Sequence, residues 1–263
     1  KGIEFLEQQF GVKWDWDAFW KNAEMYNESS RCMIEKWDVN CTEHPQVCGA
    51  ALALQREYEF MAAACMDKFM LRTDRRVTKM MLKGYEQDKA ANAPQPKYRC
   101  LVWACPAHYY TNFTYWTQHC WGVTCVNDME AMLSYQPITI GDKEQALADL
   151  VRCYEKMMMR SHTNGGYVNL LDECWKMCEK FHTNIVIMYD HVSCKNVGGL
   201  HGLFEDQARE RGIHLIWIPH DVMDPRTVSR REMREAFSQY MVTVLNEKPL
   251  DPTLLDYEDA LSW

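Results

Sequence analysis

The fold class is decided by residues 184–218, NIVIMYDHVSCKNVGGLHGLFEDQARERGIHLIWI. Two short apolar runs, at 184–189 and 214–218, are typical of buried strands. Between them, residues 199–211 place Leu200, Leu203, Phe204 and Ala208 at helical spacing. The stretch therefore predicts a strand–helix–strand unit, in which the strands pair in parallel and the helix covers the sheet.

The same alternation continues on both sides of this unit. We expect an α/β fold, a Rossmann-like open parallel sheet of about four strands with helices on both faces. In such sheets, ligands bind outside the carboxyl ends of the strands, here just after residues 105, 126, 190 and 219. Further elements are predicted as strands at 98–105 and 122–126, and as helices at 109–120, 143–159, 167–181 and 229–246, the last one capped by Ser229.

The first 95 residues or so are helical in pattern and precede the sheet. Asp15 or Asp17 can cap a first helix. A second helical region follows at 47–90, with an interruption expected near Thr73 and Asp74. The sequence thus predicts a helical region and linker at 1–96, a Rossmann-like α/β domain at 97–247 and an acidic C-terminal arm at 248–263 that lies on a partner subunit.

Composition narrows the class of partner. The formal charge of −8 argues against nucleic acid as the main partner. The longest uncharged stretch, 100–127, contains Pro106 and His108, so no membrane span is predicted. The chain starts at Lys1 with no signal-peptide pattern, and we expect that its natural start is missing.

Twelve cysteines allow two interpretations. Sequons at Asn27, Asn40 and Asn112 suit a secreted, disulfide-bonded protein. Against this, several cysteines fall inside predicted helices and strands, whereas disulfides of small secreted domains lie in loops. We favour a reducing, cytoplasmic setting in which most thiols are core residues.

The segment after the third predicted strand contains a candidate metal ligand. Cys194 lies at a strand-to-helix turn beside Lys195, a setting that favours the metal-binding thiolate. Gly198 and Gly199 allow the backbone to approach a bulky group. A turn cysteine without a role is the competing interpretation.

The segment after the fourth predicted strand offers a possible anion site. Arg226 is the first of four arginines within nine residues, and a guanidinium suits a phosphate or carboxylate. Pairing of Arg226 with Asp224, or a solvated face neutralised by the interleaved Glu232 and Glu235, is the more frequent outcome of such a pattern. Weaker metal-ligand candidates, for which core packing is the better explanation, are Cys174 with Cys178 and His108 with His119 near the ends of one helix.

Residues 184–229 resemble the C-terminal domain of the family that contains the 2-hydroxyacyl-CoA dehydratases and the ATP-dependent benzoyl-CoA reductases. The likeness rests on two motifs, each of which follows a strand, and extends weakly back through 97–126. The motifs are Ser193-Cys194-Lys195 and Asp221-x-x-Asp224-Pro225-Arg226-x-x-Ser229.

The resemblance implies one subunit of a dimer of related subunits, with a [4Fe–4S] cluster held by three cysteines. Cys194 matches the ligand from the C-terminal domain, and Ser193, Lys195 and Arg226 are the accompanying cofactor-binding residues, with Ser193 also a catalytic candidate. The other two ligands would come from an N-terminal domain that nothing here matches, so this chain alone should be inactive.

The implied chemistry is radical. An ATP-hydrolysing iron–sulfur activator would deliver one electron, which turns the acyl-CoA thioester into a ketyl-type radical anion. We expect dehydration of an (R)-2-hydroxyacyl-CoA to the enoyl-CoA. Ring reduction of benzoyl-CoA and a non-catalytic, electron-relay or structural subunit stay open as alternatives, and a cluster-free binding protein is the alternative outside the family. Aromatic residues at 103–121 either line an acyl pocket or fill the core.

Overall fold

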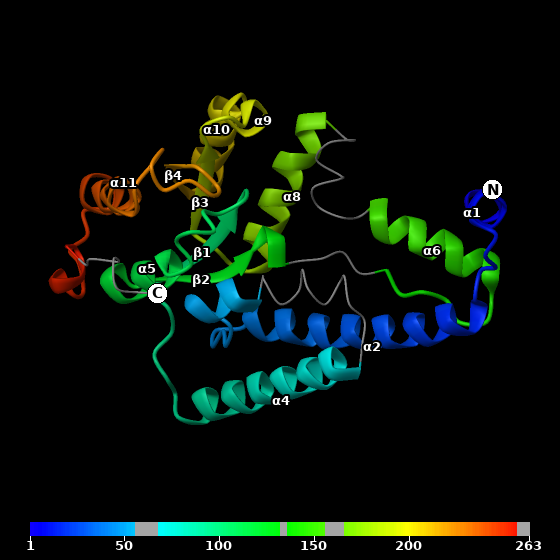
Figure 1. Cartoon of the computed structure of the whole chain (residues 1–263). Helices are drawn as coiled ribbons and strands as arrows, with labels where there is room; N and C mark the ends of the chain where they lie inside the picture. The colour runs from blue at the N-terminus through cyan, green and yellow to red at the C-terminus, as the bar shows by residue number, and fades with distance from the viewer. Residues whose placement is uncertain (56–67, 132–135, 156–165, 257–263) are drawn as a thin grey trace.

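A four-stranded, fully parallel sheet forms the centre of the molecule (Figure 1). This confirms the predicted α/β class. The computed structural model describes residues 1–55, 68–131, 136–155 and 166–256. The strands, in the spatial order β2-β1-β3-β4, are β1 (Tyr98–Trp103), β2 (Val123–Asp128), β3 (Ile185–His191) and β4 (His214–His220).

Helices cover both faces of this sheet. Helices α5 and α11 meet on one face through Phe113 and Phe237, whose ring centroids are 5.8 Å apart. Helices α8 and α10 meet through Trp175 and Phe204, at 5.7 Å. The helical elements are α1 (Gly2–Phe10), α2 (Trp16–Asn40), α4 (Lys68–Ala90), α5 (Phe113–Trp121), α6 (Lys143–Glu155), α8 (Gly166–Lys180), α9 (Lys195–Gly198), α10 (His201–Arg211), α11 (Arg230–Thr243) and the 3-10 turns η1 (Met129–Ala131) and η2 (Pro252–Leu254), with residues 50–55 also helical.

Cysteines contribute to the core, as expected from their positions in strands and helices. Cys100 and Cys125 are completely buried in the paired strands β1 and β2. Cys174 and Cys178 are buried on α8, so core packing is their role. All eleven cysteines within the described parts of the chain are free thiols. In those parts, no helix combines the length and hydropathy that a bilayer crossing needs.

The interruption expected near Thr73 and Asp74 is wrong, because α4 runs through both residues. The Thr73 hydroxyl donates to the carbonyl oxygen of Phe69 one turn earlier, which is compatible with the helix. The Asp74 carboxylate is buried and accepts from Lys36 Nζ at 3.1 Å and from the Ser29 hydroxyl at 2.5 Å. Asp74 is therefore a contact between α4 and α2 and not a turn residue.

Two of the predicted helix starts are confirmed in detail. The Asp15 carboxylate accepts the backbone N–H of Ala18 at the start of α2. Ser229 caps α11 in a reciprocal capping box with Glu232. The helix predicted at 109–120 begins only at Phe113, since residues 109–112 form turns.

Asn40 and Arg99 join the helical region to the sheet. The Asn40 side chain donates to the carbonyl oxygens of Val47 and Val126, both at 2.8 Å. Arg99, on β1, donates to the carbonyl oxygens of Asn40 at 2.6 Å and Thr42 at 2.8 Å, at the end of α2. Asn40 belongs to one of the three sequons, yet it is completely buried.

The described part of the C-terminal arm lies on the chain's own α5. The backbone N–H of Leu250 donates to the carbonyl oxygen of Cys120 at 2.7 Å. The Trp116 indole donates to the carbonyl oxygen of Leu254 at 2.9 Å. Just before the arm, Glu247 accepts from Tyr98 and Lys97, both at 2.6 Å. Contact of the arm with a partner subunit stays a prediction.

Candidate functional site

The carboxyl ends of β3 and β4 bring two histidines together. His191 ends β3 and His220 ends β4, and their ring centroids are 5.4 Å apart. The backbone N–H of Val192 donates to the carbonyl oxygen of His220 at 3.0 Å, which continues the pairing beyond the strands. The loops that carry the predicted site residues start at this edge.

Ser193 is hydrogen-bonded to His191, a residue that the sequence analysis did not select. The Ser193 backbone N–H donates to His191 Nδ1 at 3.2 Å, so Nδ1 acts as an acceptor. The Ser193 hydroxyl therefore also donates to Nδ1, at 2.9 Å. The ring proton is then on Nε2, which lies 3.9 Å from Asp221 Oδ2. The arrangement is a serine–histidine–aspartate series open to solvent.

Cys194 is half-buried at the N-cap position of the short helix α9. Its backbone N–H donates to the carbonyl oxygen of His191 at 2.9 Å, and its own carbonyl oxygen accepts from Gly198 at 3.2 Å. These bonds hold the cysteine at the carboxyl end of β3, while part of the residue remains accessible. Lys195 is exposed beside it.

Arg226 is engaged by its own loop. Its guanidinium forms a two-point contact with Asp224, Nε to Oδ1 at 2.8 Å and Nη2 to Oδ2 at 2.6 Å. The guanidinium lowers the pKa of Asp224 to about 2. Asp221 accepts the backbone N–H groups of Met223 and Asp224, and these two bonds lower the pKa of Asp221. The aspartates of the second motif thus organise the turn after β4.

The other three arginines do not form a shared anion site. Arg230 donates to the carbonyl oxygen of Tyr109 at 2.6 Å. Arg234 is buried and donates to the Tyr110 hydroxyl at 3.1 Å. Arg231 pairs with Glu235 at 2.7 Å on the exposed face of α11. Arg226 as a cofactor-binding residue stays a prediction.

The aromatic residues of 103–121 are mostly core residues. Tyr115 is exposed and packs against His119 in a tilted arrangement, with ring centroids 4.1 Å apart. The others are buried, which favours core packing over an open acyl pocket. They are Trp103, Tyr109, Tyr110, Phe113, Trp116 and Trp121.

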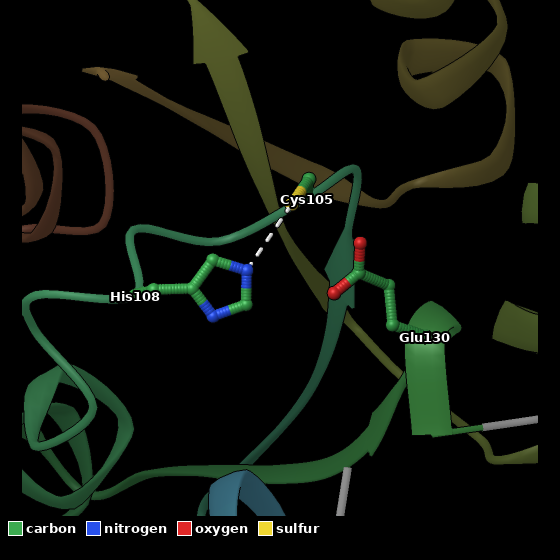
Figure 2. A group of neighbouring side chains, drawn as sticks. All are labelled: Cys105, His108 and Glu130. Carbon is green, nitrogen blue, oxygen red and sulfur yellow. Dashed lines mark hydrogen bonds between the residues drawn. The ribbon is translucent and has the colours of Figure 1, made fainter. Parts of the chain in front are cut away.

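A second group of side chains at this edge, Cys105, His108 and Glu130, was not predicted as a site (Figure 2). One ligand atom from each residue lies within 4.8 Å of the other two. His108 was expected near the end of a helix, but α5 begins five residues later and His108 lies in the loop after β1. The available signal was the position of Cys105 and Glu130 just after two neighbouring strands.

His220 lies in the interior below these loops. It is completely buried, and neither ring nitrogen has a hydrogen-bond partner within the described residues. Burial lowers the pKa of His220 to about 4. The imidazole is therefore neutral at physiological pH and cannot act there as a cation.

Comparison with known proteins identifies the family. No curated protein sequence matches the chain. The family model of the 2-hydroxyglutaryl-CoA dehydratase D-component matches residues 1–241. This match confirms the resemblance seen in residues 184–229 and extends it over the N-terminal helices. A D-component implies a partner component. The chain belongs to the 2-hydroxyglutaryl-CoA dehydratase D-component family and is a dehydratase-type subunit.

Proposed function

We propose that the chain is one subunit of an oxygen-sensitive [4Fe–4S] enzyme that dehydrates an (R)-2-hydroxyacyl-CoA to the enoyl-CoA. In this proposal Cys194 is a cluster ligand, and the remaining ligands come from outside this chain segment. A related second subunit and an ATP-hydrolysing iron–sulfur activator complete the system. The matched family favours dehydration over ring reduction of benzoyl-CoA.

The placement of Cys194 is the observation that carries the proposal. Iron–sulfur clusters are held by cysteine thiolates, and open parallel sheets bind ligands at the carboxyl ends of their strands. Cys194 is a half-buried cysteine at that edge, fixed by a backbone hydrogen bond to His191. A single thiolate cannot hold a cluster, so the isolated chain is inactive in this proposal.

The neighbours of Cys194 have roles that follow from their contacts. When bound, the cluster would supply single electrons and a Lewis-acidic iron. The Ser193 hydroxyl donates to His191 Nδ1, so these two residues can pass a proton to or from a substrate that reaches Ser193 Oγ. Asp221 lies on the Nε2 side of the ring and favours the tautomer that leaves Nδ1 as the acceptor.

Iron analysis tests the proposal. The full-length protein, purified anaerobically with its partner component, should contain iron and acid-labile sulfide, and Cys194→Ala should remove the cluster that this chain helps to hold. Cys41→Ala is the matched control, because Cys41 is also half-buried but lies at the end of α2. Unchanged iron and sulfide in Cys194→Ala would contradict the assignment.

The substrate class needs a separate assay. Product analysis with a 2-hydroxyacyl-CoA and with benzoyl-CoA should show enoyl-CoA from the first and no ring reduction of the second. If both substrates react only at a site on the partner, with Ser193→Ala and Cys194→Ala without effect on turnover, this chain is the non-catalytic subunit.

A further inference from the structure

We propose that Cys105, His108 and Glu130 form a binding site for a divalent transition metal of the zinc type, separate from Cys194. Figure 2 shows the three side chains converging from two segments. Cys105 and His108 come from the loop after β1, and Glu130 comes from η1, directly after β2. This inference goes beyond the proposed function, because it uses other loops and another kind of metal centre.

The spacing of the donor atoms fits one metal ion. Tetrahedral zinc with bonds of about 2.3 Å to sulfur and about 2.0–2.1 Å to nitrogen places these two atoms about 3.6 Å apart. Cys105 Sγ and His108 Nε2 are 3.8 Å apart. All three donor atoms lie within 4.8 Å of one another, so a small closing movement of the Glu130 side chain completes a three-ligand set.

The donor types also favour this class of metal. Thiolate, imidazole and carboxylate are the three ligand types that zinc takes from proteins. One thiolate in three donors does not suit an iron–sulfur cluster, and the sulfur and nitrogen donors do not suit magnesium or calcium. Glu130 is only 8% exposed, so its carboxylate is largely shielded from solvent.

The backbone around the three residues is held in place. Ala104, directly before Cys105, has φ +65°, and its N–H donates to Met129 Sδ at 3.2 Å. The backbone N–H of His108 donates to the carbonyl oxygen of Val222 at 2.9 Å, which ties the loop to the segment after β4. Neighbouring strands thus position donors that are 25 residues apart in sequence.

The proposed site has an open coordination position. Three protein ligands are the pattern of catalytic zinc, in which the fourth position holds water or a substrate oxygen. Here the fourth ligand would be water or an oxygen of a carbonyl or carboxylate group. The half-exposed side chains of Cys105 and His108 leave access from solvent.

Metal titration tests the inference. The reduced, metal-free full chain is titrated with Co²⁺ and then with Zn²⁺, and Co²⁺ is read by its absorption spectrum. We expect one equivalent of Co²⁺ with a thiolate-to-cobalt charge-transfer band and tetrahedral ligand-field bands, displaced by one equivalent of Zn²⁺. Cys105→Ser should remove the charge-transfer band. Changes to residues that only support a metal ligand weaken metal binding by up to about 100-fold. Loss of a ligand should cost at least as much, so His108→Asn and Glu130→Gln should each weaken Co²⁺ binding by about 100-fold or more.

Two controls separate this site from the proposed cluster site. Cys194→Ala and His119→Ala should bind Co²⁺ as the unmodified chain does, with the charge-transfer band retained. His119 is exposed on α5 and packs against Tyr115. Circular dichroism of each variant shows that it is folded. Because His108 is in a loop, His108→Asn remains informative if a Cys105 variant does not fold.

Three results would overturn the inference. The first is the absence of stoichiometric Co²⁺ binding to the unmodified chain. The second is loss of the charge-transfer band in Cys194→Ala but not in Cys105→Ser. The third is loss of iron and acid-labile sulfide in Cys105→Ser from anaerobic preparations, which would make Cys105 a cluster ligand. Failure of the Cys194 iron assay alone leaves the cobalt result standing.

Discussion

Replacement of Asp74 by asparagine should strongly destabilise the protein, because Asp74 is half of a buried ion pair. Lys36 and Asp74 are each 1% exposed, and Nζ lies 3.1 Å from Oδ1. At an effective dielectric constant of about 20, two unit charges at this distance attract by about 5 kcal/mol. Asp74→Asn removes that attraction but leaves the Lys36 ammonium buried.

The expected cost of Asp74→Asn is about 3–5 kcal/mol of unfolding free energy, the usual penalty for breaking a buried ion pair by removing one partner. Urea unfolding followed by circular dichroism measures this loss. The double variant Lys36→Met/Asp74→Leu removes both charges and keeps apolar volume between α2 and α4. It should lie within about 2 kcal/mol of the unmodified protein, although Ser29 loses an acceptor.

The exposed pair of Arg75 and Glu28, between the same two helices, is the matched control. Glu28→Gln should cost less than about 1 kcal/mol, because solvent screens exposed ion pairs. A loss of less than about 1 kcal/mol of unfolding free energy in Asp74→Asn would contradict the expected cost. A double variant that is as unstable as Asp74→Asn would contradict the explanation as well, since the loss of stability would then not come from the broken ion pair.

Two further measurements address a helix cap and the base of the C-terminal arm. Ser229→Ala removes the capping box of α11 and should cost about 1 kcal/mol in urea unfolding; no measurable cost would contradict the cap. The hydrogen bond to Glu247 raises the pKa of Tyr98 to about 12. A raised pKa stabilises the fold fully below pH about 10, and this contribution is lost as pH rises toward 12. Ultraviolet titration should lose a tyrosine step near pH 12 in Tyr98→Phe and show that step shifted downward in Glu247→Gln; an unchanged titration would refute the bond.

The sheet could be predicted from sequence because its signals are local. Apolar runs such as 185–189 are bounded by turn residues, and their short length and β-branched residues favour a strand buried on both faces over a buried helix. The Ser229 cap was also predictable, since a capping box spans only four residues. The place of Cys194 just after a strand was predictable in the same way, whereas its role as a metal ligand stays a prediction.

Interactions between distant residues could not be predicted. Aspartate is a residue type common in turns, so the local sequence around Asp74 indicates a turn. Only the contact of Asp74 with Lys36, 38 residues away, explains its place inside a helix. Glu130 and Cys105 become neighbours because β2 lies beside β1, an order that no local pattern specifies. His191 lies just after the strand predicted at 184–189, and no local pattern distinguishes it from the other residues of that loop. Its bond to Ser193 depends on the shape of the turn.

The hydrogen bonds made by Asn40 and Arg99 affect how the molecule unfolds. The last turn of α2 has carbonyl groups that its own helix cannot satisfy. The guanidinium of Arg99, on the inner strand β1, donates to two carbonyl oxygens at this end. The Asn40 amide is bound in turn to Val126 on β2. Cleavage of the chain at 91–96 would therefore leave two fragments that these hydrogen bonds still connect. The fragments should stay associated until both unfold in a single transition.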